Sequence, residues 1–185
     1  MFLYNEVQKR EVNQERVRVG LIGAGKFGSM FLSQAPFTIG LEVISIVDIC
    51  VENAKKNCRD VGWTKEQIES VLFFDNLKKM VSQTKIDVLV EATGDPVEGT
   101  KHALIAIEQG LDIVMVNVEA DVLSGPYLAK EAEKAGIVYS MAYGDQPALT
   151  TELVEWARAS GFHVVAAGKG TKYLPEYHYS TPDTV

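Results

Sequence analysis

Cysteine and histidine are scarce in this chain of 185 residues, and their scarcity limits the kinds of site it can build. The two cysteines, Cys50 and Cys58, are too few for a disulfide framework, and we expect both to be small core residues. The three histidines, His102, His163 and His178, show no metal-ligand spacing. We expect His102 to have a structural role. No Ser-His-Asp order, P-loop or C-x-x-C motif is present, and no metal site is predicted.

An excess of positive charge and long apolar runs are also lacking. The formal net charge of −7 argues against generic binding to nucleic acid, although backbone amides can still hold an anionic cofactor. No apolar run approaches the roughly 20 residues that a membrane span needs, so no membrane partner is expected. The first 16 residues contain neither the apolar region nor the cleavage site of a signal peptide. We therefore expect a cytoplasmic protein.

The most informative stretch that is present is VRVGLIGAGKFG, residues 17–28. A short apolar strand runs into G-x-G-x-x-G, and a helix follows. Gly23 is expected to make the tight turn, Gly25 to admit a pyrophosphate, and Gly28 to let the helix pack on the strand. Lys26 and Phe27 lie within the motif and are assigned to the same cofactor site. This turn predicts dinucleotide binding; the alternative is a glycine-rich turn that serves packing alone.

Asp48 supports the first interpretation, because it ends the next strand twenty residues after the last glycine of the motif. A carboxylate there would accept hydrogen bonds from the adenosine ribose hydroxyls and repel a 2′-phosphate. NAD is therefore favoured over NADP, although Lys55 and Lys56 in the following helix could weaken the preference. The alternative is an ordinary Asp at a strand end or helix N-cap.

Strands alternate with helices as far as residue 145, which predicts an α/β fold with a doubly wound parallel sheet, the Rossmann fold. An N-terminal helix should precede the sheet and pack on its outside or against a partner chain. Expected strands are 17–22, 41–47, 71–74, 86–91, 112–116 and 137–139. Expected helices are 2–15, 26–35, 51–60, 65–70, 77–81, 96–109 and 126–135.

The pattern changes after residue 145. A helix over 147–160 and a strand over 162–167 are predicted, after which we expect the chain to stop mid-fold. We therefore divide it into an N-terminal helix (1–16), a dinucleotide-binding domain (17–147) and the incomplete start of a second, catalytic and dimerisation domain (148–185).

Polar residues that follow the fourth and fifth strands are further candidates, because ligands of doubly wound sheets bind outside the carboxyl ends of the strands. Thr93 and Gly94 are expected beside the nicotinamide ribose or the pyrophosphate; a plain turn is the alternative. Asn117 could bind the carboxamide of the cofactor or a substrate hydroxyl. Glu119 could be a general base, a substrate contact or part of a structural ion pair.

Two later segments could face a small-molecule substrate. Asp145 and Gln146 open a helix, where Asp145 is either a substrate contact or the N-cap. Lys169 lies between two glycines and is suited to binding a carboxylate or phosphate, with Thr171 beside it; a solvated loop lysine is the alternative.

Taken together, these residues resemble homoserine dehydrogenase-like NAD(P)-dependent oxidoreductases. More closely, they resemble the branch with C-terminal SAF domains that includes deoxyxylulose-phosphate reductoisomerase-like enzymes. The matching segments are VRVGLIGAGKFGSMF, DVLVEATGDP, VNVEAD, YGDQP and AAGKGTKYLPEYHYSTPDTV. The resemblance implies hydride transfer between NAD(P) and a small polar hydroxy or aldehyde substrate. It also implies a following domain for dimerisation and catalysis, so we expect a homo-oligomer in the full-length form.

The chain departs from this family at two places. Homoserine dehydrogenases carry an Asn-Lys pair where this chain has Asn117-Val118-Glu119, which puts homoserine itself in doubt. They also carry an Asn-Gly-Thr turn, which Lys169-Gly170-Thr171 replaces here with a cationic variant. Two alternatives stay open: a reductoisomerase-like enzyme, and a non-catalytic nucleotide-binding or redox-sensing module. Because the chain is short, it could also bind nucleotide without turnover.

Overall fold

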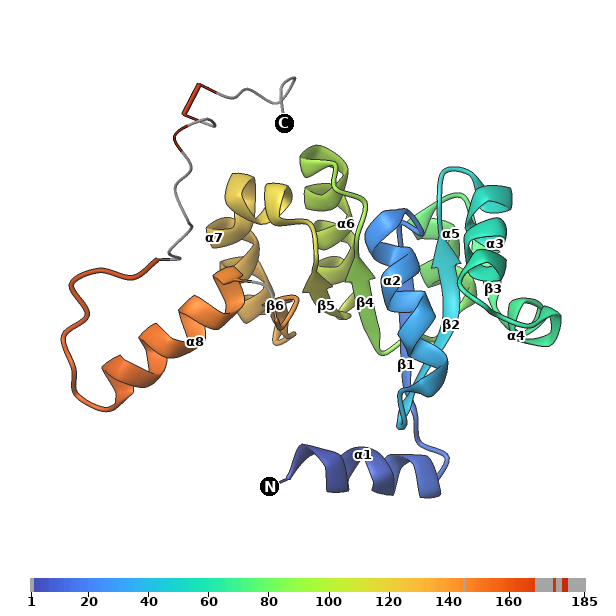
Figure 1. Ribbon diagram of the computed structural model, residues 1–185, viewed down its shortest axis with the longest axis horizontal. Helices are drawn as coiled ribbons and strands as arrows, with labels where there is room; N and C mark the ends of the chain where they lie inside the picture. The colour runs from blue at the N-terminus through green and yellow to red at the C-terminus, as the bar shows by residue number, and fades with distance from the viewer. Residues whose placement is uncertain (1, 145, 169–174, 176–177, 180–185) are drawn as a thin grey trace. The chain divides into compact units, whose positions relative to one another are not determined.

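The computed structural model describes residues 2–144, 146–168, 175, 178 and 179. The chain divides into two compact units, Met1–Ala142 and Tyr143–Val185; we predicted a domain boundary at 147/148. The first unit contains a six-stranded sheet with the order β3-β2-β1-β4-β5-β6 (Figure 1). Every paired neighbour is parallel, as the predicted doubly wound fold requires.

Most strands lie within two residues of their predicted positions. Strong apolar runs rich in Val and Ile explain this agreement, because such runs mark parallel strands that are buried on both faces. The strands are β1 (Val17–Ile22), β2 (Leu41–Val47), β3 (Leu72–Phe74), β4 (Val88–Glu91), β5 (Asp112–Met115) and β6 (Tyr139–Met141).

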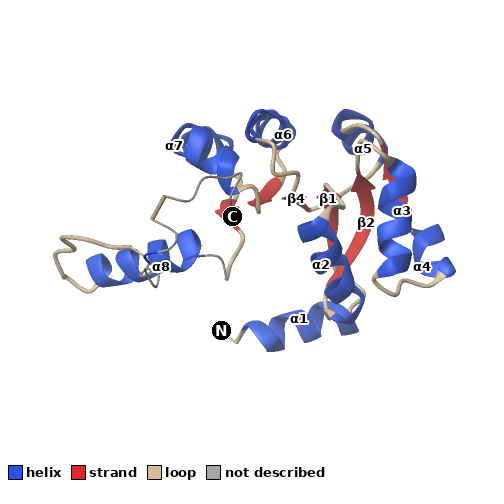
Figure 2. Cartoon of the chain, turned by 45° about the horizontal axis from the view of Figure 1, so that its top comes forward, coloured by secondary structure: helices blue, strands red, loops and turns tan. Residues whose placement is uncertain are grey.

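The helices that connect the strands cover both faces of the sheet. They are α2 (Lys26–Gln34), α3 (Val51–Asp60), α4 (Lys65–Ser70), α5 (Leu77–Gln83), α6 (Pro96–Gln109) and α7 (Val118–Ala135), with a 3-10 turn at Ala35–Phe37. In Figure 2, α5, α6 and α7 stand in a row on one side of the strands and α2 lies on the other. Each side has its own apolar cluster. Leu89 belongs to the cluster under α5, α6 and α7, whereas Leu21 belongs to the cluster under α2 and α3.

The predicted start of α7 was wrong. We predicted a helix over 126–135, but α7 begins at Val118 and contains Pro126 in its interior. The cap lies well upstream of the predicted start: the Oδ1 atom of Asn117 accepts a hydrogen bond from the Ala120 amide at 3.0 Å. The helix continues through Pro126, although proline normally interrupts a helix, and its inner face is buried at Ala120, Leu128 and Ala132.

The last strand was predicted two residues too early. Gly136 ends α7 in the left-handed conformation, and the Ile137 amide donates back to the carbonyl of Ala132. The Val138 amide is bonded to the side chain of Asp112 at 2.8 Å. Residues 137 and 138 thus complete the helix end, and β6 begins at Tyr139.

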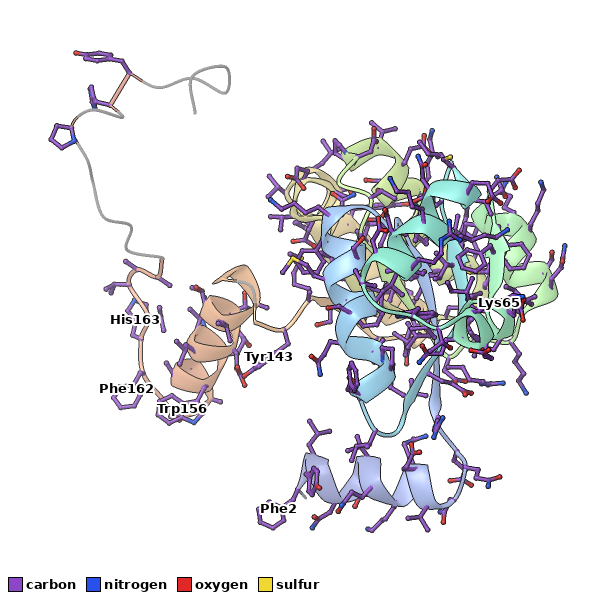
Figure 3. All side chains as sticks on the ribbon, turned by 45° about the vertical axis from the view of Figure 1, so that its right-hand side comes forward. Phe2, Lys65, Tyr143, Trp156, Phe162 and His163 are labelled. Atoms are coloured by element: carbon purple, nitrogen blue, oxygen red, sulfur yellow. The ribbon has the colours of Figure 1, made fainter. Side chains whose placement is uncertain are left out.

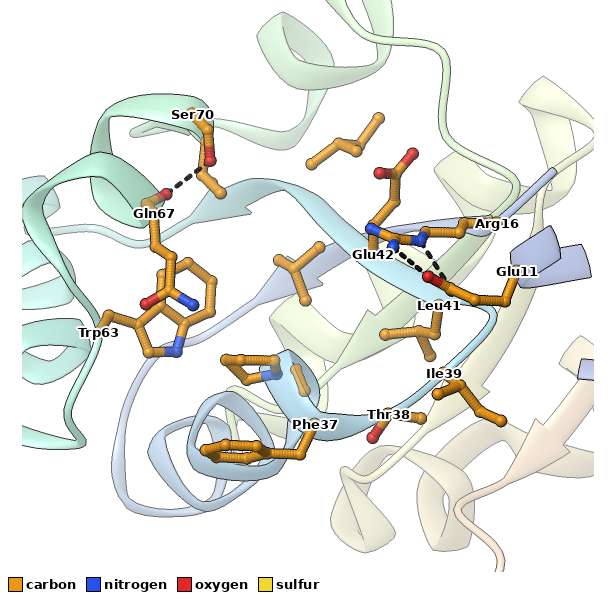
Figure 4. Close-up of a pocket in the computed structure, with 15 residues that line it drawn as sticks. Glu11, Arg16, Phe37, Thr38, Ile39, Leu41, Glu42, Trp63, Gln67 and Ser70 are labelled. Carbon is orange, nitrogen blue, oxygen red and sulfur yellow. Dashed lines mark hydrogen bonds and ion pairs between the residues drawn. The ribbon is translucent and has the colours of Figure 1, made fainter. Parts of the chain in front are cut away.

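Helix α1 (Leu3–Val12) has no buried residue, so the prediction that it packs on the outside of the sheet was wrong. It contacts the unit at Gly40: the half-buried Val7 lies against this glycine, and Glu11 accepts a hydrogen bond from the Gly40 amide at 2.9 Å. Glu11 also pairs with Arg16 beside a hollow of about 370 Å³ at the amino ends of β1 and β2 (Figure 4). This ion pair lowers the pKa of the Glu11 carboxyl. Contact with a partner chain stays a prediction.

In the second unit, α8 (Gln146–Ala159) agrees with the predicted helix. The predicted strand over 162–167 was wrong, because residues 162–168 have no regular secondary structure. A strand is stable only when a neighbouring strand pairs with it, and Phe162 and Val165 are exposed. Figure 3 labels Trp156 and Phe162, which are both largely exposed. Among the described residues, no helix has the length and apolar character that crossing a membrane requires.

Candidate cofactor site

The glycine-rich turn leaves almost no room for side chains at two of its three glycines. Gly23 has a φ of +87°, and a Cβ atom there would lie 2.9 Å from the carbonyl of Ala92 on the neighbouring strand end. A Cβ atom at Gly28 would overlap the carbonyl oxygen of Gly23. A Cβ atom at Gly25, in contrast, would have no neighbour within 4 Å, so this side of the turn is open. The close packing at Gly23 and Gly28 is the geometry expected of a tight turn and of a helix packed on its strand, whereas the role of Gly25 in admitting a pyrophosphate stays a prediction.

Side chains from two neighbouring elements hold the turn in place. Asp48, at the end of β2, accepts a hydrogen bond from the Ala24 amide at 3.0 Å and another from the Cys50 amide at 2.9 Å. Asn57 on α3 donates to the carbonyl of Ala24 at 2.7 Å. Both the amide and the carbonyl of Ala24 are therefore engaged by side chains of the chain itself. Asn57 was not among the predicted site residues, because a polar residue inside a helix gives no local signal of a contact 33 positions away.

The end of β4 carries a buried carboxylate. Glu91 has 0% exposure, and its Oε1 atom accepts hydrogen bonds from the Thr93 hydroxyl at 2.5 Å and from His102 Nδ1 at 3.1 Å. Thr93 and Gly94 lie in the turn that follows, where Gly94 is exposed and has a φ of +77°. The Asp95 side chain then caps α6 by accepting hydrogen bonds from the backbone amides of Val97 and Glu98. Neither Glu91 nor its link with His102 was predicted; a carboxylate that ends an apolar strand was the available signal.

The two candidates after β5 have different environments. Asn117 is buried, and its Nδ2 atom donates to the carbonyl of Asp95 at 2.8 Å and to the Thr93 hydroxyl at 3.3 Å. With its oxygen engaged at Ala120, this amide joins the β4–α6 turn to the start of α7. Direct contact with a carboxamide or a substrate stays a prediction. Glu119 lies in the first turn of α7 and is exposed.

Of the other predicted site residues, Lys26 and Phe27 are exposed in the first turn of α2, directly after the glycine-rich turn. Gln146 is the first residue of α8. Asp145, Lys169 and Thr171 lie outside the described residues.

A cleft of about 470 Å³ at the carboxyl ends of β1, β2 and β4 is lined by four of the predicted cofactor residues, Gly23, Gly25, Asp48 and Thr93; Lys26, Phe27, Gly28, Gly94 and Asn117 do not line it. Ligands of doubly wound sheets bind at this edge. Among the described residues, four carboxylate side chains line the cleft, so it disfavours additional negative charge. Its lining residues are Ile22, Gly23, Gly25, Val47, Asp48, Ile49, Asp75, Asn76, Leu77, Ala92, Thr93, Asp95, Glu98 and His102.

Models of two known protein families match the chain. The model of the homoserine dehydrogenase NAD-binding domain matches residues 19–142, and the model of the catalytic domain of oxidoreductase DRL matches residues 144–185. Because the first match covers more than half of the chain, the chain belongs to the family of homoserine dehydrogenase NAD-binding domains. It therefore contains an NAD-binding domain with the Rossmann fold. No significant match is found among curated proteins.

Solved structures of dehydrogenases share the fold. The WlbA dehydrogenase from Bordetella pertussis, in complex with NADH and UDP-GlcNAcA, is 20% identical with a TM-score of 0.54, covering 79% of this chain and 43% of its own. The myo-inositol 2-dehydrogenase from Lactobacillus plantarum is 15% identical with a TM-score of 0.54, covering 79% of this chain and 42% of its own. An NAD binding oxidoreductase from Klebsiella pneumoniae is 17% identical with a TM-score of 0.57, covering 79% of this chain and 39% of its own. The chain thus spans less than half the length of each of these relatives, and at these identities the likeness shows the fold alone.

Proposed function

We propose that this chain is the cofactor-binding part of an NAD-dependent oxidoreductase that transfers hydride between the nicotinamide and a small polar hydroxy or aldehyde substrate. The cleft at the carboxyl ends of β1, β2 and β4 carries this proposal, because it joins an open Gly25, the Asp48 carboxylate and the β4–α6 turn. The protein supplies position and electrostatics, while the hydride chemistry belongs to the cofactor. The oxidoreductase catalytic-domain match of residues 144–185 favours catalysis over a non-catalytic binding module.

Within this proposal, Asp48 selects NAD over NADP. Its two oxygens each accept one backbone amide, and each oxygen keeps a lone pair for a ribose hydroxyl. A 2′-phosphate would meet Asp48 together with Asp75, Asp95 and Glu98 in the same cleft. Lys55 does not line this cleft; it pairs with Glu52 at 2.9 Å and lies over the Phe73 ring.

The substrate-facing part of the proposal rests on the second unit and on Glu119. Asp145, Gln146 and Thr171 would contact the substrate, while Glu119 and Lys169 would carry catalytic roles. The finer relationship, to the branch with C-terminal SAF domains, is a proposal that rests on the segments GDQP and GKGTKYLPEYH. We propose a homo-oligomer for the full-length form.

Calorimetric titration with NADH and then NADPH tests the cofactor assignment. We expect NADH to bind more tightly, and we expect Asp48→Ala to weaken NADH binding more than NADPH binding. Asp60→Ala is the matched control, because Asp60 is exposed at the end of α3 and does not line the cleft. Equal losses for the two cofactors in Asp48→Ala would refute the role of Asp48. Absence of binding for both cofactors in the unmodified chain would refute the proposed function.

A further inference from the structure

The buried Glu91 carboxylate is hydrogen-bonded to two residues that line the cofactor cleft, Thr93 and His102. Burying a charge is costly unless hydrogen bonds compensate it. The Oε1 atom is compensated by the Thr93 hydroxyl and by His102, and both of these residues line the cleft. The Oε2 atom has no hydrogen-bond partner among the described residues. Glu91 is therefore buried directly beneath the lining of the cleft, and its hydrogen bond fixes the position of the His102 ring.

This contact determines which nitrogen of His102 is available to a ligand. An ionised carboxylate only accepts hydrogen bonds, so Nδ1 of His102 carries the proton that is shared with Glu91 Oε1 at 3.1 Å. In the neutral ring the other nitrogen, Nε2, is then an acceptor. The His102 side chain is 16% exposed, and its residue lines the cleft. In that form Nε2 is the ring nitrogen left to accept a hydrogen bond from a ligand, and the charged side chains that line the cleft, among the described residues, are carboxylates.

The position of His102 within the cleft indicates which part of a dinucleotide it would meet. The pyrophosphate belongs at the glycine-rich turn, and the adenosine ribose belongs at the carboxylate that ends β2, here Asp48. Asp48 and Asn76, which follows β3, line the cleft together with His102. The adenosine half of the cofactor is therefore expected in the same cleft that His102 lines.

We propose that His102 is a specificity-determining residue for the cofactor. Glu91 orients its ring, and Nε2 accepts a hydrogen bond from adenosine, given either by the adenine amino group or by a ribose hydroxyl. This inference rests on the proposed function, because it requires the cofactor to bind in this cleft. It replaces the purely structural role that we predicted for His102 from the sequence.

Titration of the 185-residue chain with NADH and with AMP tests this proposal in the variant His102→Gln. Glutamine can still donate to Glu91, so the buried carboxylate keeps a partner and the melting temperature should stay near that of the unmodified chain. We expect roughly tenfold weaker binding of both ligands, about the value of one hydrogen bond in a cleft. His163→Gln is the matched control, because His163 is exposed in the second unit. Unchanged affinity for NADH and AMP in His102→Gln would overturn the proposal.

A dinucleotide with hypoxanthine in place of adenine identifies the donor. If the adenine amino group is the donor, the unmodified chain binds this analogue about as weakly as His102→Gln binds NADH. If a ribose hydroxyl is the donor, the unmodified chain binds the analogue as tightly as NADH, while His102→Gln still binds both more weakly. Both results support a hydrogen bond to His102. If replacing adenine by hypoxanthine weakens binding more in His102→Gln than in the unmodified chain, the hydrogen bond to His102 is contradicted.

Nitrogen-15 spectra of the imidazole rings provide a measurement that needs no variant. In the free chain, His102 should show the form protonated at Nδ1, and NADH should shift its Nε2 resonance while the resonances of His163 stay in place. A neutral ring protonated at Nε2, or an Nε2 resonance that NADH does not move, would overturn the proposal even if His102→Gln failed to fold. If the unmodified chain binds no NADH, the proposed function itself fails. Normal NADH binding with an unresponsive His102 refutes this inference alone.

Discussion

The two units of the chain contain similar apolar side chains but use them differently. In the first unit the sheet has helices on both faces, and fully buried residues such as Leu21, Leu89 and Leu128 form its two cores. In the second unit, none of the described residues is buried, and Leu153 and Trp156 are largely exposed on α8. An amphipathic helix becomes stable mainly through the surface on which its apolar face packs. The sheet, rather than composition, therefore makes a core in this protein.

The two tryptophans of the chain make the comparison measurable. Trp63 is buried in the first unit, where its indole Nε1 donates to the carbonyl of Leu32 at 2.7 Å. Trp156 belongs to α8 and is exposed. In a Trp156→Phe background, Trp63 is the remaining tryptophan, and its fluorescence reports the unfolding of the first unit by urea. All the urea-unfolding measurements predicted below use this Trp156→Phe background.

The largest effect should come from the glycine-rich turn between β1 and α2. Gly28→Ala places a Cβ atom against the Gly23 carbonyl oxygen, with no space between them, so the turn has to open. We expect a loss of about 4 kcal/mol of unfolding free energy and at least a roughly hundredfold loss of NADH affinity. Urea unfolding and calorimetry measure the two losses.

Gly25→Ala is the control, because no atom lies within 4 Å of the added Cβ and φ is −68°. Its stability should change by less than about 0.5 kcal/mol. NADH affinity should still fall, because the methyl group takes the space of the pyrophosphate. Equal destabilisation by the two variants would contradict the close packing described at Gly28.

A pair of leucine truncations compares the two units directly. Leu89→Ala removes a fully buried side chain from β4, and we expect it to cost roughly 3 kcal/mol of unfolding free energy. Leu153→Ala removes a side chain that is 67% exposed on α8, and its effect on Trp63-detected unfolding should stay within about 0.5 kcal/mol. Similar losses for the two variants would mean that α8 packs on a surface as α6 does on the sheet, and the contrast between the units would fail.

A smaller effect is expected at the first turn of α6. Asp95 accepts hydrogen bonds from two amides of that turn, and Asp95→Ala should cost about 1 kcal/mol in urea unfolding. Asp95→Asn keeps an acceptor and should cost only a few tenths of a kcal/mol. Because α6 also packs through buried residues such as Ala103 and Ala106, the helix should survive both changes. Loss of folding in Asp95→Ala would mean that the cap outweighs packing.

The smallest effect concerns charge. Arg18 on β1 donates from its backbone amide and from its guanidinium to Asp87, at distances of 2.5–3.0 Å, and this contact lowers the pKa of the Asp87 carboxyl. A carboxyl with a depressed pKa in the folded state adds stability above its unfolded pKa of about 3.9. This stability is lost as the pH falls through the lower, folded pKa. The side chains are partly exposed, so the contribution should be below about 1 kcal/mol.

Urea unfolding at neutral pH and at acidic pH checks the sign. Asp87→Asn should destabilise the first unit at neutral pH and reduce the further loss on acidification. Glu155→Gln removes the partner of Arg158 in a local pair on α8 and should leave both values unchanged. An unaltered pH dependence in Asp87→Asn would show that the Arg18 contact does not contribute to stability.

The strands and the edge of the sheet at which the cleft lies could be predicted from the sequence because their signals are local. Apolar runs mark the parallel strands, and the glycine-rich turn and Asp48 follow two of them. The contacts that organise the site could not be predicted, because each joins distant positions. Asn57 reaches Ala24 across 33 residues, Asn117 reaches Asp95 across 22, and His102 meets Glu91 from the next helix.

By itself, then, the sequence determined the parallel sheet and the edge of the sheet at which the glycine-rich turn and Asp48 lie, since periodicity and turn chemistry act over a few residues. Only the tertiary structure decided that α7 begins at Val118 instead of near Pro126, and that residues 162–168 do not form a strand. The same holds for the buried Glu91, which orients His102 toward the cleft. These outcomes depend on which groups meet in space and on whether a neighbouring strand or donor is present to satisfy the backbone and the buried charge.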